Sequence, residues 1–326
     1  MQKEKLFRQE YNKLPQDERE TLLRSIAETD AKFKFLRFEK FVRFGMQTDT
    51  AVYLCGGSEF VFVPGDTVTL GWEDFAMGMD ENTRLDIQEG WEDYFGTEIG
   101  DLTALLRESM SPIREVTVSP MLVERELRDI GWRRVDYDSP ELEPFRKDIQ
   151  KHFTANQRSL EIHNKMRIYR ENGEVVAEMY EPVSMADFIS KLHSSGFSLP
   201  TEDEWEYLCG GGSRTLFRWG DSFNYDMKLD HFDGKEPKDK PYNLRQPNQF
   251  GLSIAYDPYK YEVVENSEYF LKGGDGGCNI CGGLGITLGY LPTATYFRSC
   301  RLSNDELDYQ SDIGGDYTFF RRIVRI

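Results

Sequence analysis

The sequence lacks the features of a membrane-embedded or exported chain. It contains no run of about 18 apolar residues, the length that a transmembrane helix needs. Its first residues, MQKEKLFRQEYNK, include no apolar segment of the kind that signal peptides carry. We therefore predict a soluble, cytoplasmic protein with no membrane partner.

Basic residues are scarce relative to acidic ones. The 326 residues include 40 Lys and Arg against 57 Asp and Glu, which gives a formal net charge of -17. Nucleic-acid binding depends on clustered Lys and Arg that neutralise phosphates, and here the basic residues are dispersed along the chain. The composition therefore argues against nucleic acid as a partner, and the acidic excess favours solubility.

Cysteine and histidine are also too few for several common kinds of site. Five cysteines in a chain of this length do not form a disulfide scaffold, and Cys55, in the apolar run AVYLC, is expected to be a buried small hydrophobe. The four histidines include no HExxH pair, and no GxSxG segment occurs. GGDGG also lacks the Lys-Ser/Thr ending of a phosphate-binding loop. Zinc-protease, serine-hydrolase and P-loop chemistry are not expected.

The most strongly patterned segment that is present spans residues 199 to 220, LPTEDEWEYLCGGGSRTLFRWG. Thr201 and Glu204 have the spacing of a capping box, and Trp205 and Leu208 with Cys209 form an apolar face at helical spacing. Three glycines then end the helix. The pattern predicts a capped helix, a glycine break and an aromatic strand.

This segment resembles the signature of the formylglycine-generating enzyme and sulfatase-modifying-factor family. Other segments similar to that family follow in its order: FVFVPGDTVTL (60–70), PIREVTVSPMLVEREL (112–127), PVSMADF (182–188), PNQFGL (247–252), KGGD (272–275) and FRRIV (320–324). The resemblance implies an irregular α+β fold of the C-type-lectin-like class. Residues 60 to 70 also predict, by themselves, a hairpin that turns at Pro64-Gly65.

The predicted organisation is a helical extension over residues 1–50 and a formylglycine-generating-enzyme-like domain over 51–326. We expect Phe33, Leu36, Phe41 and Phe44 to form one apolar helix face in the extension, which either covers the core or binds a partner. Two insertions are expected, at about 76–111, with a helix over DLTALLRESM, and at about 133–181. The second should hold a helix around 141 to 163 and a hairpin that turns at Asn172-Gly173.

The candidate chemistry lies in a glycine-rich segment, residues 273 to 289, which contains eight glycines and both Cys278 and Cys281. The resemblance implies that these thiols bind Cu(I), a soft ion that favours sulfur ligands, and that copper activates dioxygen to oxidise a substrate cysteine. Two departures from the family are visible: the second cysteine comes three residues after the first instead of five, and Asp275 replaces a serine of the catalytic pocket.

Other interpretations of the two thiols stay open. They can be packing residues in a tight loop, a redox dithiol or half of a zinc site. A redox dithiol usually sits at a helix start, and the surrounding glycines argue against a helix here. A zinc site needs two more ligands, and neither His231 nor Cys300 lies in a recognisable pattern.

The resemblance also implies a calcium site and a binding surface. Of the calcium ligands only Glu262 is kept, with Asp257 as a possible second oxygen donor, so an oxygen-rich cage is not expected. Tyrosines at alternate positions on a strand either line a ligand groove or pack in the core. The predicted binding residues are Tyr256, Tyr259, Tyr261, Tyr296 and Arg298.

One further pair of cysteines is implied by the resemblance. Cys209 and Cys300 fall where some secreted family members place the two halves of a disulfide, so we expect them to be close, as a thiol pair or a bridge. Two functions remain. The first is a non-catalytic scaffold that binds a peptide, a protein or a small thiol ligand, and the second is a Cu(I)- and O2-dependent thiol oxidase that uses Cys278 and Cys281.

Overall fold

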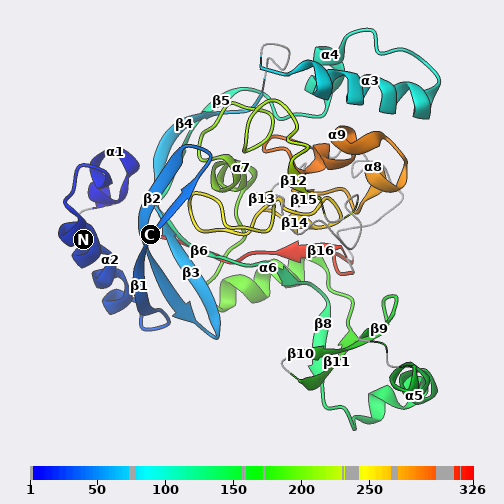
Figure 1. The fold of residues 1–326 in the computed structure, drawn as a ribbon. Coiled ribbons are helices and arrows are strands. Elements are labelled where there is room, and N and C mark those ends of the chain that lie inside the picture. The colour runs from blue at the N-terminus through cyan, green and yellow to red at the C-terminus, as the bar shows by residue number, and fades with distance from the viewer. Residues whose placement is uncertain are drawn as a thin grey trace.

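The computed structural model shows a mixed α+β protein built from several mostly antiparallel sheets with helices around them (Figure 1). It describes residues 3–72, 78–155, 157, 159–171, 173–229, 231, 242–265, 271–298, 312–315 and 317–326. Within this described part, no helix is long and apolar enough to cross a membrane.

A five-stranded antiparallel sheet forms the centre of the amino-terminal half. Its strands, in spatial order, are β1 (Lys34–Arg43), β2 (Met46–Cys55), β3 (Ser58–Val63), β6 (Met121–Glu124) and β17 (Ile323–Arg325). The helix predicted from Phe33, Leu36, Phe41 and Phe44 is wrong, because this segment is β1. Pairing with β2 over the whole strand outweighs the local spacing, and Phe44 and Gly45, at φ 47° and 75°, make the turn.

The first helices cover one face of this sheet (Figure 1). They are η1 (Lys3–Leu6), α1 (Arg8–Tyr11) and α2 (Gln16–Thr29). The Tyr53 hydroxyl of β2 donates to the Leu23 carbonyl at 2.8 Å, and the Tyr11 hydroxyl donates to the Asp49 carbonyl at 2.7 Å. Burial of apolar residues from both layers joins the helices to the sheet, as expected for a covering role.

The predicted hairpin over residues 60 to 70 is only half right. Both strands form, but β4 (Asp66–Leu70) pairs with β5 (Arg114–Val118), whereas β3 pairs with β2 and β6. Gly65 makes the corner between the two sheets, because a side chain there would come within 2.8 Å of the Pro120 backbone nitrogen. The family-like segment 112–127 contains β5 and β6.

The capped helix is confirmed. Helix α7 (Glu202–Gly210) begins with a capping box between Thr201 and Glu204 and ends at Gly211, at φ 63°. Trp205, Leu208 and Cys209 are fully buried. The aromatic strand predicted after it is wrong, since Phe217 and Gly220 form only an isolated bridge across a tight turn. Helix α6 (Met185–Ser194) precedes α7 and begins within the family-like segment 182–188, with Ser184 as its cap.

Short strands complete the core. A four-stranded sheet has the order β15 (Leu271–Lys272), β14 (Tyr261–Val263), β16 (Thr318–Phe320) and β7 (Arg128–Asp129), and β12 (Met227–Lys228) pairs with β13 (Tyr242–Asn243). Between these two strands, residues 230 and 232–241 lie outside the described part of the chain.

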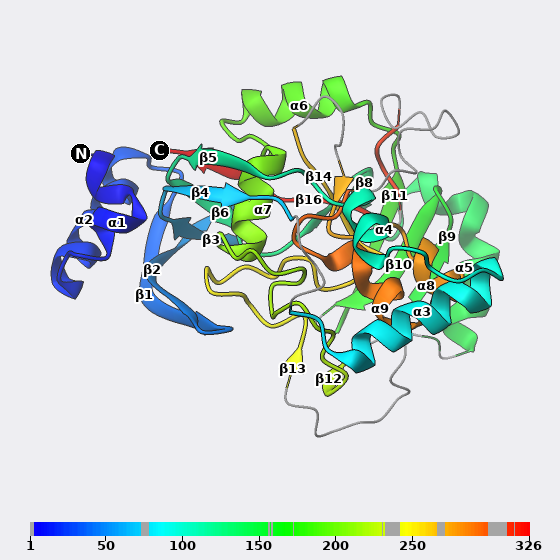
Figure 2. The same cartoon turned by 90° about the horizontal axis from the view of Figure 1, so that it is seen from above.

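The first insertion packs on the cysteine-bearing segment. It consists of α3 (Glu81–Phe95) and the predicted helix α4 (Leu102–Glu108), and Figure 2 shows α3 beside α8 (Cys278–Cys281) and α9 (Gly285–Tyr290), which η3 (Leu291–Thr293) follows. Gly90 allows this approach, because a side chain there would meet the Leu284 carbonyl oxygen at 2.2 Å. The Asp86 carboxylate accepts from the Thr287 amide at 2.7 Å.

The second insertion forms an accessory unit with its own small core. Its sheet has the order β8 (Trp132–Val135), β11 (Glu174–Tyr180), β10 (Met166–Glu171) and β9 (Ser159–Ile162). The β10–β11 hairpin is confirmed, although Asn172 of its turn lies outside the described residues. The helix expected around 141 to 163 is too long: η2 (Pro140–Phe145) and α5 (Arg146–Thr154) are followed by β9, which pairs with β10.

Candidate functional site

Cys278 and Cys281 are the first and last residues of the single helical turn α8, and both are exposed. The prediction that glycines prevent a helix here is wrong. Gly277, at φ 79°, begins the turn, and its carbonyl accepts from the Cys281 amide at 2.8 Å. Asp275 stabilises the turn, since its carboxylate accepts from the Asn279 amide at 3.0 Å. Residues three apart lie on one helix face, so both thiols face the same way.

Tyr259 is the nearest polar partner of the turn. Its hydroxyl lies 3.0 Å from the Cys281 sulfur. This hydrogen bond, aided by burial, raises the pKa of Tyr259 to about 12, so the phenol is protonated at neutral pH and can donate to the sulfur when Cys281 is a thiolate. Gly277 makes the contact possible, because a side chain at that position would come within 2.2 Å of the tyrosine ring.

A histidine–aspartate pair lies behind Tyr259. The His231 Nε2 atom is 2.8 Å from an Asp257 carboxylate oxygen, which also accepts from the Tyr259 amide at 3.1 Å. The His231 and Tyr259 rings have centroids 4.5 Å apart. Asp257 thus fixes both the imidazole and the tyrosine backbone, and the hydroxyl of Tyr259 is held toward Cys281.

Exposed aromatic side chains surround the turn. Tyr94 and Phe95, at the end of α3, are each 47% exposed, and Tyr317 is 44% exposed. Tyr94 approaches Gly282, where an added side chain would lie 3.5 Å from its ring, and the Tyr317 and Tyr259 rings are 5.7 Å apart. We call Tyr94, Phe95, Tyr259 and Tyr317 the aromatic rim. Contiguous exposed apolar surface of this kind is typical of interaction sites.

We expect the Tyr259→Phe substitution to slow alkylation of Cys281 several-fold at pH 8. A hydrogen bond donated to a charged sulfur stabilises the reactive thiolate, and such bonds are worth roughly 1.5–3 kcal/mol before solvent screening. Iodoacetamide labelling with site-resolved mass spectrometry measures both rates. Cys278, which lies on the same turn, is the internal control and should keep its rate. Equal slowing of the two cysteines would instead mean that the turn itself had changed.

Of the other predicted binding residues, Tyr261 lies beside the glycine-rich segment, since a side chain at Gly276 would come within 3.3 Å of its ring, whereas Tyr256, Tyr296 and Arg298 make contacts elsewhere. Of the three tyrosines only Tyr261 lies on a strand. Tyr261 and Tyr256 pack against two different apolar clusters of the core. The Lys260 ammonium donates to the Tyr256 hydroxyl at 3.3 Å. Tyr296 is fully buried, and its hydroxyl donates to the Ser213 carbonyl. Arg298 makes two hydrogen bonds, at 2.8 and 2.6 Å, to Glu202.

A calcium ion does not fit at Glu262. This residue is 1% exposed, and its two carboxylate oxygens accept from Arg321 at 2.7 and 3.0 Å. Asp257, the other expected ligand, is engaged by His231. Among the residues that the structure describes, no group of three or more His, Cys, Asp or Glu side chains could hold a metal ion.

Two thiolates suit Cu(I) better. Side chains three apart on a helix have Cβ atoms about 5–6 Å apart. Sulfur atoms that extend from such positions can approach to roughly 4–5 Å, about twice a metal–sulfur bond. The donor set of Cys278 and Cys281 therefore fits a soft ion with few ligands.

The remaining described cysteines are internal. Cys55 and Cys209 are free and buried, as predicted for Cys55. Burial raises the pKa of Cys55, and it raises that of Cys209 to about 11. The Cys209 sulfur lies 4.0 Å from the Thr295 hydroxyl. Cys300 lies outside the described residues, so its predicted proximity to Cys209 stays a prediction.

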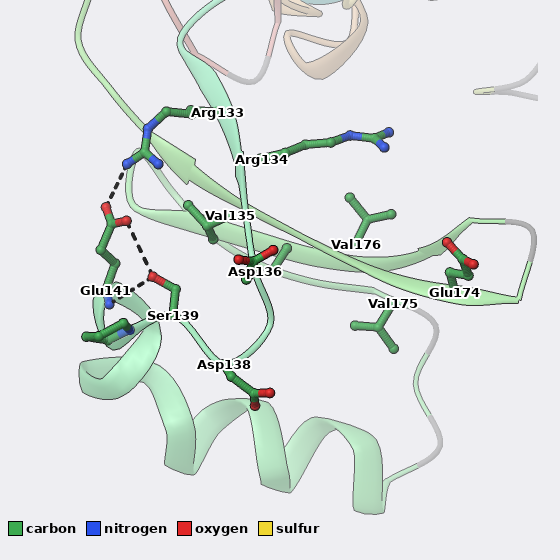
Figure 3. A pocket seen from close by; sticks show the side chains of 12 residues that line it. Arg133, Arg134, Val135, Asp136, Asp138, Ser139, Glu141, Glu174, Val175 and Val176 are labelled. Atoms are coloured by element: carbon green, nitrogen blue, oxygen red, sulfur yellow. Dashed lines mark hydrogen bonds and ion pairs between the residues drawn. The ribbon is translucent and has the colours of Figure 1, made fainter.

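A hollow of about 680 Å³ lies apart from α8, on the accessory unit (Figure 3). It opens between β8 with the turn after it and the start of β11, and charged side chains dominate its walls. Arg133 pairs with Glu141 at 2.6 Å, and Arg134 pairs with Glu171 at 2.8 Å. Exposed ion pairs contribute little binding energy, and the cysteine turn is the stronger candidate site.

Two parts of the cysteine site escaped the sequence analysis, whereas Tyr259 was among the predicted binding residues. Tyr94 and Phe95 of the aromatic rim had a local signal, since they follow Trp91 by three and four positions on one helix face. The pairing of His231 with Asp257 joins residues that are 26 positions apart, and no local pattern marks it.

No protein-family model matches the chain, and a search of curated proteins gave no match. The motif resemblance is therefore an inference from the residues quoted above.

Proposed function

We propose that the chain is a divergent member of the sulfatase-modifying-factor class with a C-type-lectin-like core. Support comes from the family-like segments, which follow in family order. Those segments form the β3, β5 and β6 strands, helices α6 and α7, and the carboxyl-terminal strand β17. The two insertions are then additions to that core.

We further propose that it acts as a non-catalytic scaffold that binds a peptide, a protein or a small thiol ligand at the cysteine turn. The observation that carries this proposal is the exposure of both thiols on one helical turn, within the aromatic rim. Exposed aromatic groups supply contact area at low entropic cost, and a thiol can add a specific polar or covalent contact. Arg298 and Glu262, by contrast, are engaged in internal ion pairs.

Peptide selection tests this function. A pool of random heptapeptides with a central cysteine, beside the same pool with serine, is selected against the reduced protein. We expect the cysteine pool to yield binders whose affinity falls about tenfold in Tyr94→Ala and Phe95→Ala, the size of a typical interface hot spot. Tyr137→Ala is the matched control, because Tyr137 is 39% exposed and lies on the accessory unit. No preference for cysteine, or equal losses in all three variants, would refute the proposal.

The second candidate is a Cu(I)- and O2-dependent oxidase of a cysteine or another thiol. The specific observation in its favour is that Cys278 and Cys281 are both solvent-accessible and on one helix face. They would hold the ion, which when bound supplies the oxygen chemistry. Tyr259 would orient the Cys281 sulfur, and the aromatic rim would exclude water and hold the substrate.

Anaerobic Cu(I) titration decides between the two. The oxidase predicts one tightly bound ion per reduced chain, loss of that site in both Cys278→Ala and Cys281→Ala, and oxygen uptake when a thiol substrate is added. The scaffold predicts no substrate-dependent oxygen uptake. Unchanged copper stoichiometry in both variants would eliminate the oxidase.

A further inference from the structure

A second hollow, of about 450 Å³, lies where α6 meets the base of the accessory unit. Figure 1 shows α6 beside β16 and near the start of β8, the strand that enters this unit. The volume lies within the roughly 300–1,000 Å³ that is usual for small-molecule sites, which favour such junctions between units. The cysteine turn contributes no residue to its lining, so it is independent of the proposed function.

One face of α6 forms a wall of this hollow. Asp187, Phe188, Lys191, Leu192 and Ser195 recur at spacings of one and three, which places them on one side of the helix. The floor is apolar and partly aromatic, with Ile130, Trp132, Val183 and Phe320 opposite the helix. The Phe188 and Phe320 rings meet edge to face at 4.8 Å.

Most charged side chains around the hollow take part in ion pairs. Arg322 makes two hydrogen bonds to Glu124, at 2.8 and 2.6 Å, and Arg128 lies 3.5 Å from the same carboxylate. Arg133 pairs with Glu181, and Asp129 pairs with Arg167.

Two charges on α6 remain. The Asp187 carboxylate accepts from the Ser184 hydroxyl at 2.7 Å at the helix start, where the helix dipole favours a negative charge. Lys191 is exposed, and no carboxylate of the described residues forms an ion pair with it. The edge of this hollow therefore presents Lys191 to an incoming anion, beside Arg128, which shares the Glu124 carboxylate with Arg322.

We propose that this hollow binds a small amphipathic monocarboxylate. The apolar part lies against Phe188, Leu192 and Phe320, where burial supplies most of the affinity. The carboxylate accepts hydrogen bonds from the Lys191 ammonium at the solvent edge, and a charge-assisted bond there fixes the orientation. No covalent step is involved.

The test uses three isosteric probes, 4-phenylbutyrate, 4-phenylbutanol and 4-phenylbutylamine, titrated into the full chain by calorimetry. We expect the carboxylate to bind best and the amine worst. Lys191→Gln should weaken 4-phenylbutyrate about tenfold and leave the alcohol unchanged. Lys151→Gln, on the exposed side of α5, is the control and should change neither.

A blocking variant makes the result decisive. Ser195→Phe fills the hollow from the end of α6, where the backbone conformation, φ -89° and ψ 3°, accepts any residue. It should abolish binding of all three probes while the unfolding midpoint stays near wild type. Binding that survives this variant, equal affinity for the three probes, or a Lys191→Gln effect that is the same for the acid and the alcohol would overturn the proposal.

Discussion

Replacing Arg321 by Met should lower the free energy of unfolding by about 3–5 kcal/mol, the usual cost of removing one partner of a buried ion pair. Arg321 is 0% exposed and is bound to both carboxylate oxygens of Glu262, itself 1% exposed. Its guanidinium also donates to the carbonyls of Glu124 and Ser253, at 2.9 and 2.7 Å. The substitution leaves a carboxylate and several carbonyls buried without donors.

Urea unfolding measures the loss, and two further variants identify its cause. The double variant Arg321→Met with Glu262→Leu has no unpaired buried charge. It should therefore recover much of the lost free energy of unfolding. Arg37→Met removes an exposed arginine, 42% accessible, from its pair with Glu59 and should cost no more than about 1 kcal/mol. A loss below about 1 kcal/mol in Arg321→Met would show that this pair is not sealed from water.

Removing either Cys278 or Cys281 should weaken binding of phenylarsine oxide by about 10²–10⁴-fold. Once arsenic is bound to one thiol, the second thiol on the same helix face is present at high effective concentration. A protein with only one of the two sulfurs lacks this increase in affinity. The two cysteines begin and end α8, a turn fixed by Gly277 and Asp275. The reduced protein is titrated with phenylarsine oxide, and competition with a small dithiol gives the relative affinities of wild type and variants.

Cys55→Ala is the control for that titration. Cys55 is buried in the first sheet, so its removal should not change arsenical affinity. If Cys278→Ala or Cys281→Ala binds the arsenical as tightly as wild type, the two sulfurs do not act together, and both functions proposed for the turn lose their basis.

The sequence predicted the elements that carry their own local signals. The capping box of Thr201 and Glu204 identified the start of α7, and the glycines that follow identified its end. Asn172-Gly173 between alternating residues identified the β10–β11 hairpin. In each case the decisive interactions lie within a few residues, so the pattern contains the information.

The errors occur where distant partners decide. Residues 34–43 have apolar groups at helical spacing. They nevertheless form β1, because the ten-residue strand β2 pairs with them in an antiparallel arrangement. Similarly, β4 leaves its neighbour β3 for β5, which lies more than forty positions later in the sequence. Pairing over such separations depends on the whole fold and cannot be read from local propensity.

In the candidate site, too, local features could be predicted and distant contacts could not. Cys278 and Cys281 were recognisable from their glycine-rich surroundings, but the helical turn that aligns them was not expected. The contact of Tyr259 with Cys281 spans 22 positions, and Tyr94 reaches the turn from an insertion far earlier in the chain. The thiol pair, and Tyr259 as a binding residue, could thus be predicted, whereas the contact between Tyr259 and Cys281 and the rest of the aromatic rim required the fold.

Site-resolved alkylation of the reduced, folded protein tests the central claim most directly. That claim is that Cys278 and Cys281 face solvent together while the other described cysteines are sealed. At pH 8 we expect N-ethylmaleimide to label Cys278 and Cys281 rapidly and to leave Cys55 and Cys209 unmodified until the protein unfolds. Burial raises the pKa of Cys209 to about 11, which further suppresses its thiolate. Protection of Cys278 or Cys281 to the level of Cys209 would contradict the account.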